Sequence, residues 1–93
     1  MHYTSEEIKN LVQQTKEFLT SNIVSDFTEL ESLRAVIRFH EWQYYVQDNP
    51  LISDYEYDLL YKLLEHTEAT HPDWQTSDSP TQRVSSDLVD QFQ

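Results

Sequence analysis

The same helix-start pattern occurs three times in this sequence, and this repetition constrains the fold more than any other feature. A Ser or Thr followed three residues later by Glu can form a capping box, in which the two side chains satisfy free backbone N–H groups. The pattern occurs at Thr4–Glu7, Thr28–Glu31 and Ser53–Glu56. Apolar residues with a helical period follow each box, so the sequence predicts an all-α fold, a small domain of about three main helices.

The apolar stripes and the proline positions predict how far each helix extends. The inner stripes are Ile8, Leu11, Val12, Phe18 and Leu19 in the first helix, Leu30, Leu33, Ile37, His40 and Tyr44 in the second, and Tyr57, Leu60, Tyr61 and Leu64 in the third, flanked by Leu59 and Leu63. We expect the first helix to end near Thr20, the second before Asn49–Pro50 and the third near Pro72. The short link 48–52 predicts an antiparallel pair of helices, followed by an irregular C-terminal tail.

Composition excludes several classes of site. The chain has no Gly and no Cys, so it contains no glycine-rich phosphate loop, thiolate metal site or disulfide. Its 17 acidic and 6 basic residues give a net charge of −11, which disfavours direct binding to a phosphate backbone. We find no apolar run long enough for a membrane span and no signal peptide, and we expect a cytoplasmic protein without a membrane partner.

The richest stretch for chemistry is 40–58, HEWQYYVQDNPLISDYEYD. Tyr44 and Tyr45 fall at the end of the second helix, and Asp54, Tyr57 and Asp58 share one face at the start of the third. Because the link between these helices is short, we expect aromatic faces and two carboxylates to converge on one pocket. Such a pocket suits a planar cation that carries a sugar, and oxidised nicotinamide riboside is a group of this kind.

Each of these residues also has a purely structural interpretation. Asp54 could cap the third helix, the tyrosines could be core residues, and Asp58 could be a solvated position. Arg38 could reach a phosphate, or it could form an ordinary surface pair with Glu41.

The histidines give no sign of a metal centre. His40 and Glu41 begin like the zinc motif HExxH, but Tyr44 takes the place of the second histidine. We therefore predict no metal site and interpret His40 as a partly buried structural residue. No arrangement of nucleophile, base and acid can be argued, so we predict no catalytic residue.

Two motifs resemble the most N-terminal domain of bacterial NAD-dependent DNA ligases. The first is Tyr44-Tyr45, Pro50 and Ser53-Asp54-x-x-Tyr57-Asp58, and the second is Asp-Ser-Pro-Thr-Gln-Arg-Val at 78–84. The resemblance covers about residues 33–84. The chain departs from the family pattern at Ser85, where Gly is usual, and at Tyr45, where many members have His.

The resemblance implies binding of the nicotinamide mononucleotide half of NAD as a leaving group during enzyme adenylation. Tyr44 and Tyr57 would flank the ring, Asp54 and Asp58 would hold the ribose or carboxamide, and Tyr45, helped by Arg38, would reach the phosphate. The full-length protein would be an NAD-dependent DNA ligase for replication and repair. Its adenylation domain would supply the nucleophilic lysine and bind magnesium, nicked DNA would be held by other domains, and this fragment would be inactive alone.

The resemblance also suggests a division of the chain. We predict an N-terminal helical extension at 1–27, the nicotinamide mononucleotide-binding helical domain at 28–77, and a linker with the start of the adenylation domain at 78–93. Two alternatives remain. The acidic charge is compatible with a non-catalytic helical protein-interaction module, and the fold alone could serve as a stand-alone NAD sensor.

Overall fold

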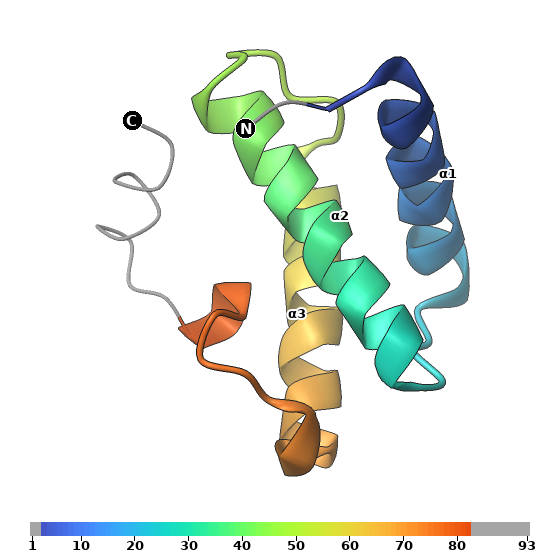
Figure 1. The fold of residues 1–93 in the computed structure, drawn as a ribbon, viewed down its shortest axis with the longest axis vertical. Coiled ribbons are helices and arrows are strands. Elements are labelled where there is room, and N and C mark those ends of the chain that lie inside the picture. Colours follow the sequence, from blue (N-terminus) through green and yellow to red (C-terminus); the bar gives the residue numbers. More distant parts are fainter. Residues whose placement is uncertain (1–2, 83–93) are drawn as a thin grey trace.

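A computed structural model describes residues 3–82 as three helices followed by two short 3-10 turns (Figure 1). The elements are α1 (Ser5–Ser21), α2 (Phe27–Tyr45), α3 (Asp54–Thr70), η1 (Pro72–Trp74) and η2 (Pro80–Gln82). The described residues contain no strand, so the predicted all-α class is confirmed. Residues 83–93 of the predicted irregular tail lie outside the described residues.

Two of the three predicted capping boxes form. The Thr4 hydroxyl accepts from the Glu7 N–H at 3.1 Å, and Glu7 Oε1 accepts from the Thr4 N–H at 2.9 Å. Ser53 and Glu56 make the same pair of bonds at the start of α3, at 3.1 and 2.9 Å. These reciprocal bonds satisfy backbone donors that a helix start would otherwise leave free.

The predicted start of α2 at Thr28 is wrong by two residues. Asp26 caps this helix by accepting from the Glu29 N–H at 2.8 Å, and Glu29 Oε1 accepts from the Ser25 N–H at 2.8 Å. Asp is as good a helix cap as Ser and better than Thr, so the earlier carboxylate takes the position. Thr28 lies inside the first turn of the helix.

Helix ends follow the expected signals although the chain has no glycine. Asn22 ends α1 in the left-handed conformation with φ 55°, and Asp48 adopts φ 51° in the link after α2. Asn and Asp tolerate this conformation better than other non-Gly residues, so they replace the usual glycine. α2 ends at Tyr45, before Pro50, and α3 ends at Thr70, before Pro72, as predicted.

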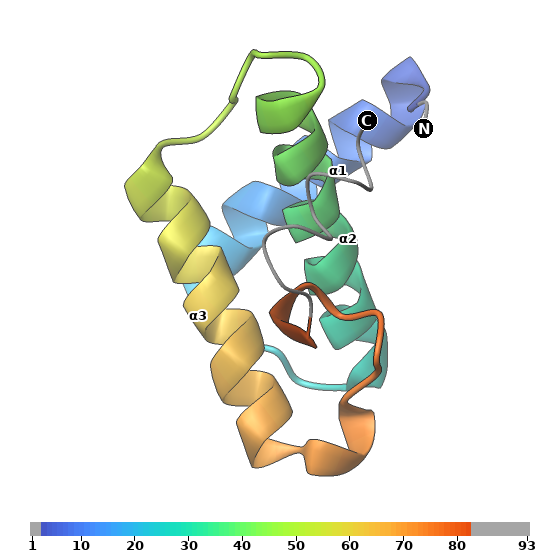
Figure 2. The same ribbon diagram turned by 90° about the vertical axis from the view of Figure 1, so that its left-hand side faces the viewer.

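The helices surround one core. α2 and α3 run antiparallel and are joined by the link 46–53 at one end of the molecule, and α1 packs against both helices (Figures 1 and 2). The buried apolar residues come from all three helices: Leu11, Phe18, Leu30, Leu33, Val36, Ile37, Phe39, Trp42, Leu60, Leu63 and Leu64. α1 is therefore part of the hydrophobic core, whatever its role as the predicted N-terminal extension.

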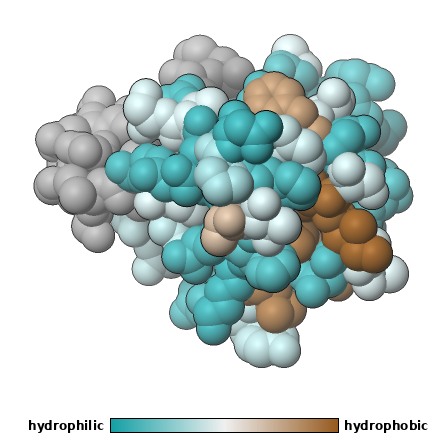
Figure 3. Space-filling model, turned by 90° about the horizontal axis from the view of Figure 1, so that it is seen from below, coloured by the Kyte–Doolittle hydropathy of each residue, from teal (hydrophilic) through white to brown (hydrophobic). Residues whose placement is uncertain are grey.

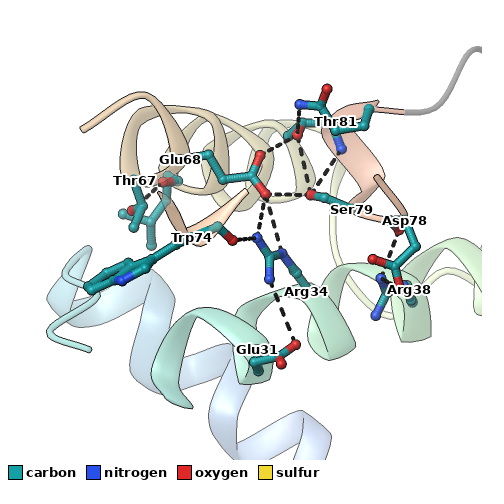
Figure 4. Close-up of polar contacts among 11 residues, drawn as sticks. Glu31, Arg34, Arg38, Thr67, Glu68, Trp74, Asp78, Ser79 and Thr81 are labelled. Atoms are coloured by element: carbon teal, nitrogen blue, oxygen red, sulfur yellow. Dashed lines mark hydrogen bonds and ion pairs between the residues drawn. The ribbon is translucent and has the colours of Figure 1, made fainter. Parts of the chain in front are cut away.

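After α3 the chain turns back, and η2 packs against α2 and α3 through a buried polar group, which we call the Glu68 cluster (Figures 2 and 4). It comprises the side chains of Arg34, Glu68, Ser79 and Thr81 and the carbonyl of Trp74. Arg34 donates to Glu68 Oε2 at 2.8 and 3.2 Å and to the Trp74 carbonyl at 2.6 Å. Ser79 donates to Glu68 at 2.6 Å, and Thr81 donates to its other oxygen. Residues 79–81 are thereby fixed on the helices.

The face of the molecule at the end where α3 finishes is largely polar (Figure 3). This face shows mainly hydrophilic residues, with a compact hydrophobic cluster on one side (Figure 3). Ile23, in the connection between α1 and α2, and Phe27, the first residue of α2, are among the exposed apolar residues. Within residues 3–82, no helix combines the length and apolarity needed to cross a membrane.

Candidate functional site

A cavity of about 180 Å³ lies where the end of α2 meets the start of α3. Its walls come from the last turns of α2, the link and the first turn of α3. The lining residues are His40, Glu41, Tyr44, Tyr45, Pro50, Leu51, Ile52, Ser53, Asp54 and Tyr57. We call this space the helix-junction cavity.

Four of the six predicted binding residues line this cavity, namely Tyr44, Tyr45, Asp54 and Tyr57. Tyr44 is 54% exposed, and its ring meets that of Tyr45 edge to face, with centroids 4.9 Å apart. Tyr57 is partly buried and stacks against Tyr61 at 6.2 Å. Because neither Tyr44 nor Tyr57 is enclosed in the core, both rings can present surface to a ligand.

Asp54 is not the cap of α3. Ser53 takes that position, and Asp54 is the first helical residue. A carboxylate in the first turn is stabilised by the partial positive charge of the helix start. Asp54 is exposed and lines the cavity, so its carboxylate is available to a ligand.

The other two predicted residues, Asp58 and Arg38, are not among those that line the cavity. Asp58 forms an exposed ion pair with Lys62 one turn further along α3, at 3.1 Å. Arg38 donates to the Asp78 carbonyl at 2.9 Å and lines a second hollow, of about 330 Å³, which also has residues of α1 in its wall. Their roles in ligand binding stay predictions.

Sequence reasoning missed Glu41 as a site residue. The expectation of a surface position is wrong, because Glu41 is 3% exposed and lines the cavity. Its Oε2 accepts a hydrogen bond from the Tyr57 hydroxyl at 2.8 Å. One signal was available in the sequence. Glu41 lies four residues after the buried Ile37, and this spacing places both on one helix face.

His40 forms another part of the cavity wall and is buried, as expected of a structural histidine. Its Nε2 lies 2.9 Å from the Thr15 hydroxyl. That hydroxyl donates its proton to the Leu11 carbonyl at 2.6 Å, so it accepts from His40 Nε2–H. Burial lowers the pKa of His40 from 6.5 to about 4, although the charge of Glu56 acts to raise it. The ring is therefore neutral at pH 7 and ties α2 to α1.

The electrostatic character of the cavity is anionic. Two carboxylates, Glu41 and Asp54, line it, and none of the Lys or Arg side chains of residues 3–82 does. Aromatic faces attract cations, and carboxylates accept hydrogen bonds from hydroxyl and amide donors. The arrangement is suited to a flat, positively charged ring that carries hydrogen-bond donors. No group of three or more metal-binding side chains occurs among residues 3–82.

Comparison with known proteins places the chain in context. A family model described as "DNA ligase-like, N-terminal NAD+-binding domain" matches residues 24–85. A DNA ligase of Sulfurihydrogenibium azorense is 48% identical over 95 residues, covering 97% of this chain and 14% of that protein. A DNA ligase of Aquifex aeolicus is 42% identical over 97 residues, with the same coverage. A DNA ligase of Roseiflexus castenholzii is 53% identical over 62 residues, covering 67% of this chain and 9% of that protein.

The chain thus spans about one seventh of the length of the first two of these curated relatives. The matches to the two ligases that cover 97% of the chain take in most of α1 as well as the helix-junction cavity.

Proposed function

This chain belongs to the family of N-terminal NAD+-binding domains of DNA ligases, and from this premise we propose that it binds the nicotinamide mononucleotide half of NAD. In the proposal, the domain orients this half as the leaving group. A lysine of a separate adenylation domain attacks the phosphorus of the AMP half, and the bond between the two phosphates breaks. Holding the leaving group in line lowers the entropic part of the barrier.

The observation that supports this proposal most strongly is the convergence of Tyr44, Tyr57 and Asp54 on the helix-junction cavity. Its volume of about 180 Å³ lies below the roughly 300 Å³ at which pockets for complete drug-sized ligands begin. A cavity of this size fits one ring and part of its sugar better than a whole dinucleotide. The remaining contacts would come from the adenylation domain when the two domains close on NAD.

Each lining residue has a role in this proposal. Tyr44 and Tyr57 flank the nicotinamide ring, Asp54 accepts hydrogen bonds from the ribose hydroxyls or the carboxamide, and Tyr45 contacts the phosphate. Asp58 would need to exchange its ion pair with Lys62 for the ligand, at a small cost because the pair is exposed. Arg38 would need to turn away from residue 78.

The activity of the complete protein is a further part of the proposal. The relatives are DNA ligases, so we propose NAD-dependent sealing of nicked DNA in replication and repair, in the cytoplasm. The family's Lys-x-Asp-Gly motif does not occur in this chain, which has no Gly. The adenylated lysine, magnesium and the DNA contacts are accordingly assigned to other domains.

The test separates adenylation from sealing in the full-length enzyme. Tyr57→Ala and Asp54→Ala are expected to reduce self-adenylation by NAD strongly, while sealing of pre-adenylated nicked DNA is retained. Tyr55→Ala is the matched control, because Tyr55 is exposed, lies on the same helix and does not line the cavity. An equal loss of both steps in the Tyr57 and Asp54 variants would contradict the proposal.

The net charge of −11 favours one other candidate function, an acidic protein-interaction module without a ligand. Tyr44 and Tyr57 would then serve only in packing. A titration of the chain with nicotinamide mononucleotide distinguishes the two functions. The interaction module predicts no response of the residues that line the cavity.

A further inference from the structure

α1 reaches the wall of the helix-junction cavity through a buried side chain, that of Thr15. This residue is 3% exposed, and its hydroxyl lies 2.9 Å from Nε2 of His40, which lines the cavity. The family model matches residues 24–85, so it includes His40 but not Thr15. The contact therefore joins a helix outside the matched segment to a residue of the proposed binding site.

The chemistry of the two groups fixes the direction of each hydrogen bond at Thr15. The hydroxyl has one proton, which it donates to the Leu11 carbonyl at 2.6 Å. It therefore accepts the proton that His40 carries on Nε2. Because the ring is neutral at pH 7, its other nitrogen, Nδ1, carries no proton. One hydroxyl thus sets both the orientation and the tautomer of the ring.

The His40 ring depends on this bond for its orientation. Its Nδ1 is buried and has no hydrogen-bond partner among residues 3–82. The Phe39 ring meets the His40 ring edge to face, with centroids 5.1 Å apart, but this contact does not distinguish the two ring nitrogens. Without the Thr15 hydroxyl, the Nε2–H group would be buried without an acceptor, which is costly. We then expect the ring to turn or to change tautomer, and a turned ring alters the cavity wall.

We infer that Thr15 is a positioning residue for nicotinamide mononucleotide, which acts by fixing the His40 ring in the wall of the helix-junction cavity. This inference rests on the proposed function and deepens it, because it gives α1 a part in ligand binding besides its part in the core. A wall that is ordered before the ligand arrives lowers the ordering cost of binding. Thr15 is not among the residues that line the cavity, so it acts through His40.

α3 offers a matched control for this arrangement. Thr67 is 5% exposed, and its hydroxyl donates to the Leu63 carbonyl four residues earlier at 2.7 Å, which is the same local bond as that of Thr15. Neither Thr67 nor Leu63 is among the residues that line the cavity. Valine keeps the branched shape of threonine but has no hydroxyl. Thr67→Val therefore removes a buried hydroxyl of the same kind without touching the proposed site.

The experiment measures the dissociation constant of nicotinamide mononucleotide for the 93-residue chain by NMR titration, at a temperature where circular dichroism shows every variant to be folded. Thr15→Val is expected to weaken binding about fivefold. Thr15→Ser keeps the hydroxyl and is expected to bind within about twofold of the wild-type chain. Thr67→Val is expected to leave the constant unchanged.

A spectroscopic signal separates this role from a purely structural one. The ¹⁵N shifts of the His40 ring report which nitrogen carries the proton. We expect the Nε2–H form in the wild-type chain and in the Thr15→Ser and Thr67→Val variants, and a changed ring signal in Thr15→Val alone. In the wild-type chain, nicotinamide mononucleotide should also shift the ring signal of His40. This last measurement does not require any variant to fold.

The outcomes distinguish this inference from the proposed function. If the wild-type chain does not bind nicotinamide mononucleotide, the proposed function fails, and the inference fails with it. If the wild-type chain binds and Thr15→Val binds no more weakly than Thr67→Val, the proposed function stands and the positioning role of Thr15 is overturned. The same holds if the ligand leaves the ring signal of His40 in the wild-type chain unchanged.

Discussion

Two buried carboxylates of this domain, Glu68 and Glu41, lie in different parts of the fold. Glu68 is 1% exposed, and Arg34, Ser79 and Thr81 all donate hydrogen bonds to it. Burial acts to raise the pKa of Glu68, but these hydrogen bonds and the charge of Arg34 together hold it below its usual value. The protein itself satisfies this carboxylate.

Glu41 is almost equally buried, yet it forms part of the wall of a cavity that opens between exposed tyrosines. The two motifs that carry the family resemblance therefore lie in two different regions of the domain. Residues of the motif at 44–58 line the helix-junction cavity, which is the proposed binding site, whereas residues 79–81 of the motif at 78–84 fix the end of the described chain to α2 and α3 through the Glu68 cluster. In this account, one motif contributes to the proposed binding site and the other contributes to the stability of the fold.

The largest expected effect on the free energy of unfolding comes from breaking the Glu68 cluster. Glu68→Ala leaves the Arg34 guanidinium buried without its carboxylate, which costs about 3–5 kcal/mol of unfolding free energy. Urea denaturation followed by circular dichroism measures the loss. Glu65→Ala, at an exposed position on the same helix, is the control and is expected to stay within about 0.5 kcal/mol of wild type. A small loss for Glu68→Ala would show that the cluster does not hold the fold together.

Acid should destabilise the domain in two steps that belong to the two regions. His40, in the cavity wall, has a pKa of about 4 in the folded chain against 6.5 in the unfolded chain. Between these two pH values the unfolded chain binds a proton at His40 that the folded chain does not bind. Stability is then lost as pH falls from 6.5 to about 4, by up to about 3 kcal/mol. The folded pKa of Glu68 is lowered, so its contribution is present above its ordinary pKa and is lost as pH falls further.

Unfolding free energies measured across this pH range test the assignment. His40→Gln should remove the upper step and keep the lower one, whereas a matched substitution of the exposed His66 should change neither. A profile that is flat between pH 6.5 and 4 in the wild-type chain would show that His40 is not held neutral by burial.

Substitutions in the helix-junction cavity should have the opposite effect to those in the Glu68 cluster, changing ligand binding more than stability. Tyr44 is 54% exposed, so Tyr44→Ala should change stability by no more than about 0.5 kcal/mol. Loss of one stacking surface should weaken binding of nicotinamide mononucleotide by about 1–3 kcal/mol. Thermal unfolding and an NMR titration of the same sample give both values. A variant that binds normally would remove Tyr44 from the site.

The smallest expected effect tests how the start of α3 contributes to the cavity. Ser53→Ala and Thr4→Ala each remove the cap of a helix and should each cost about 1 kcal/mol of stability. Only Ser53 lines the cavity, and it precedes Asp54. Ser53→Ala should therefore also weaken binding of nicotinamide mononucleotide, whereas Thr4→Ala should not. Equal binding by both variants would show that the site tolerates a loosened α3.

Much of the fold was predictable because its signals are local. The boxes at Thr4 and Ser53 and the stops before Pro50 and Pro72 depend on neighbouring residues, and they gave correct helices. The start of α2 was misplaced because Asp26 and Thr28 are competing caps only two residues apart.

The parts that escaped prediction depend on contacts between distant segments. Arg34 and Glu68 are 34 positions apart, and Glu41 reaches Tyr57 16 positions later. Helical spacing gives the face on which a residue lies, but it does not show which donor from another helix will satisfy a buried carboxylate. The tyrosines and Asp54 were predictable as a group because a short link forces two helix ends together.

The most direct test of the account is an NMR titration of the 93-residue chain with nicotinamide mononucleotide, followed at assigned backbone amides. The account predicts that the largest shifts occur at Tyr44, Asp54 and Tyr57, while Ser79 and Thr81 in the Glu68 cluster stay unchanged. Shifts centred on the Glu68 cluster, or no shift at saturating ligand, would contradict it.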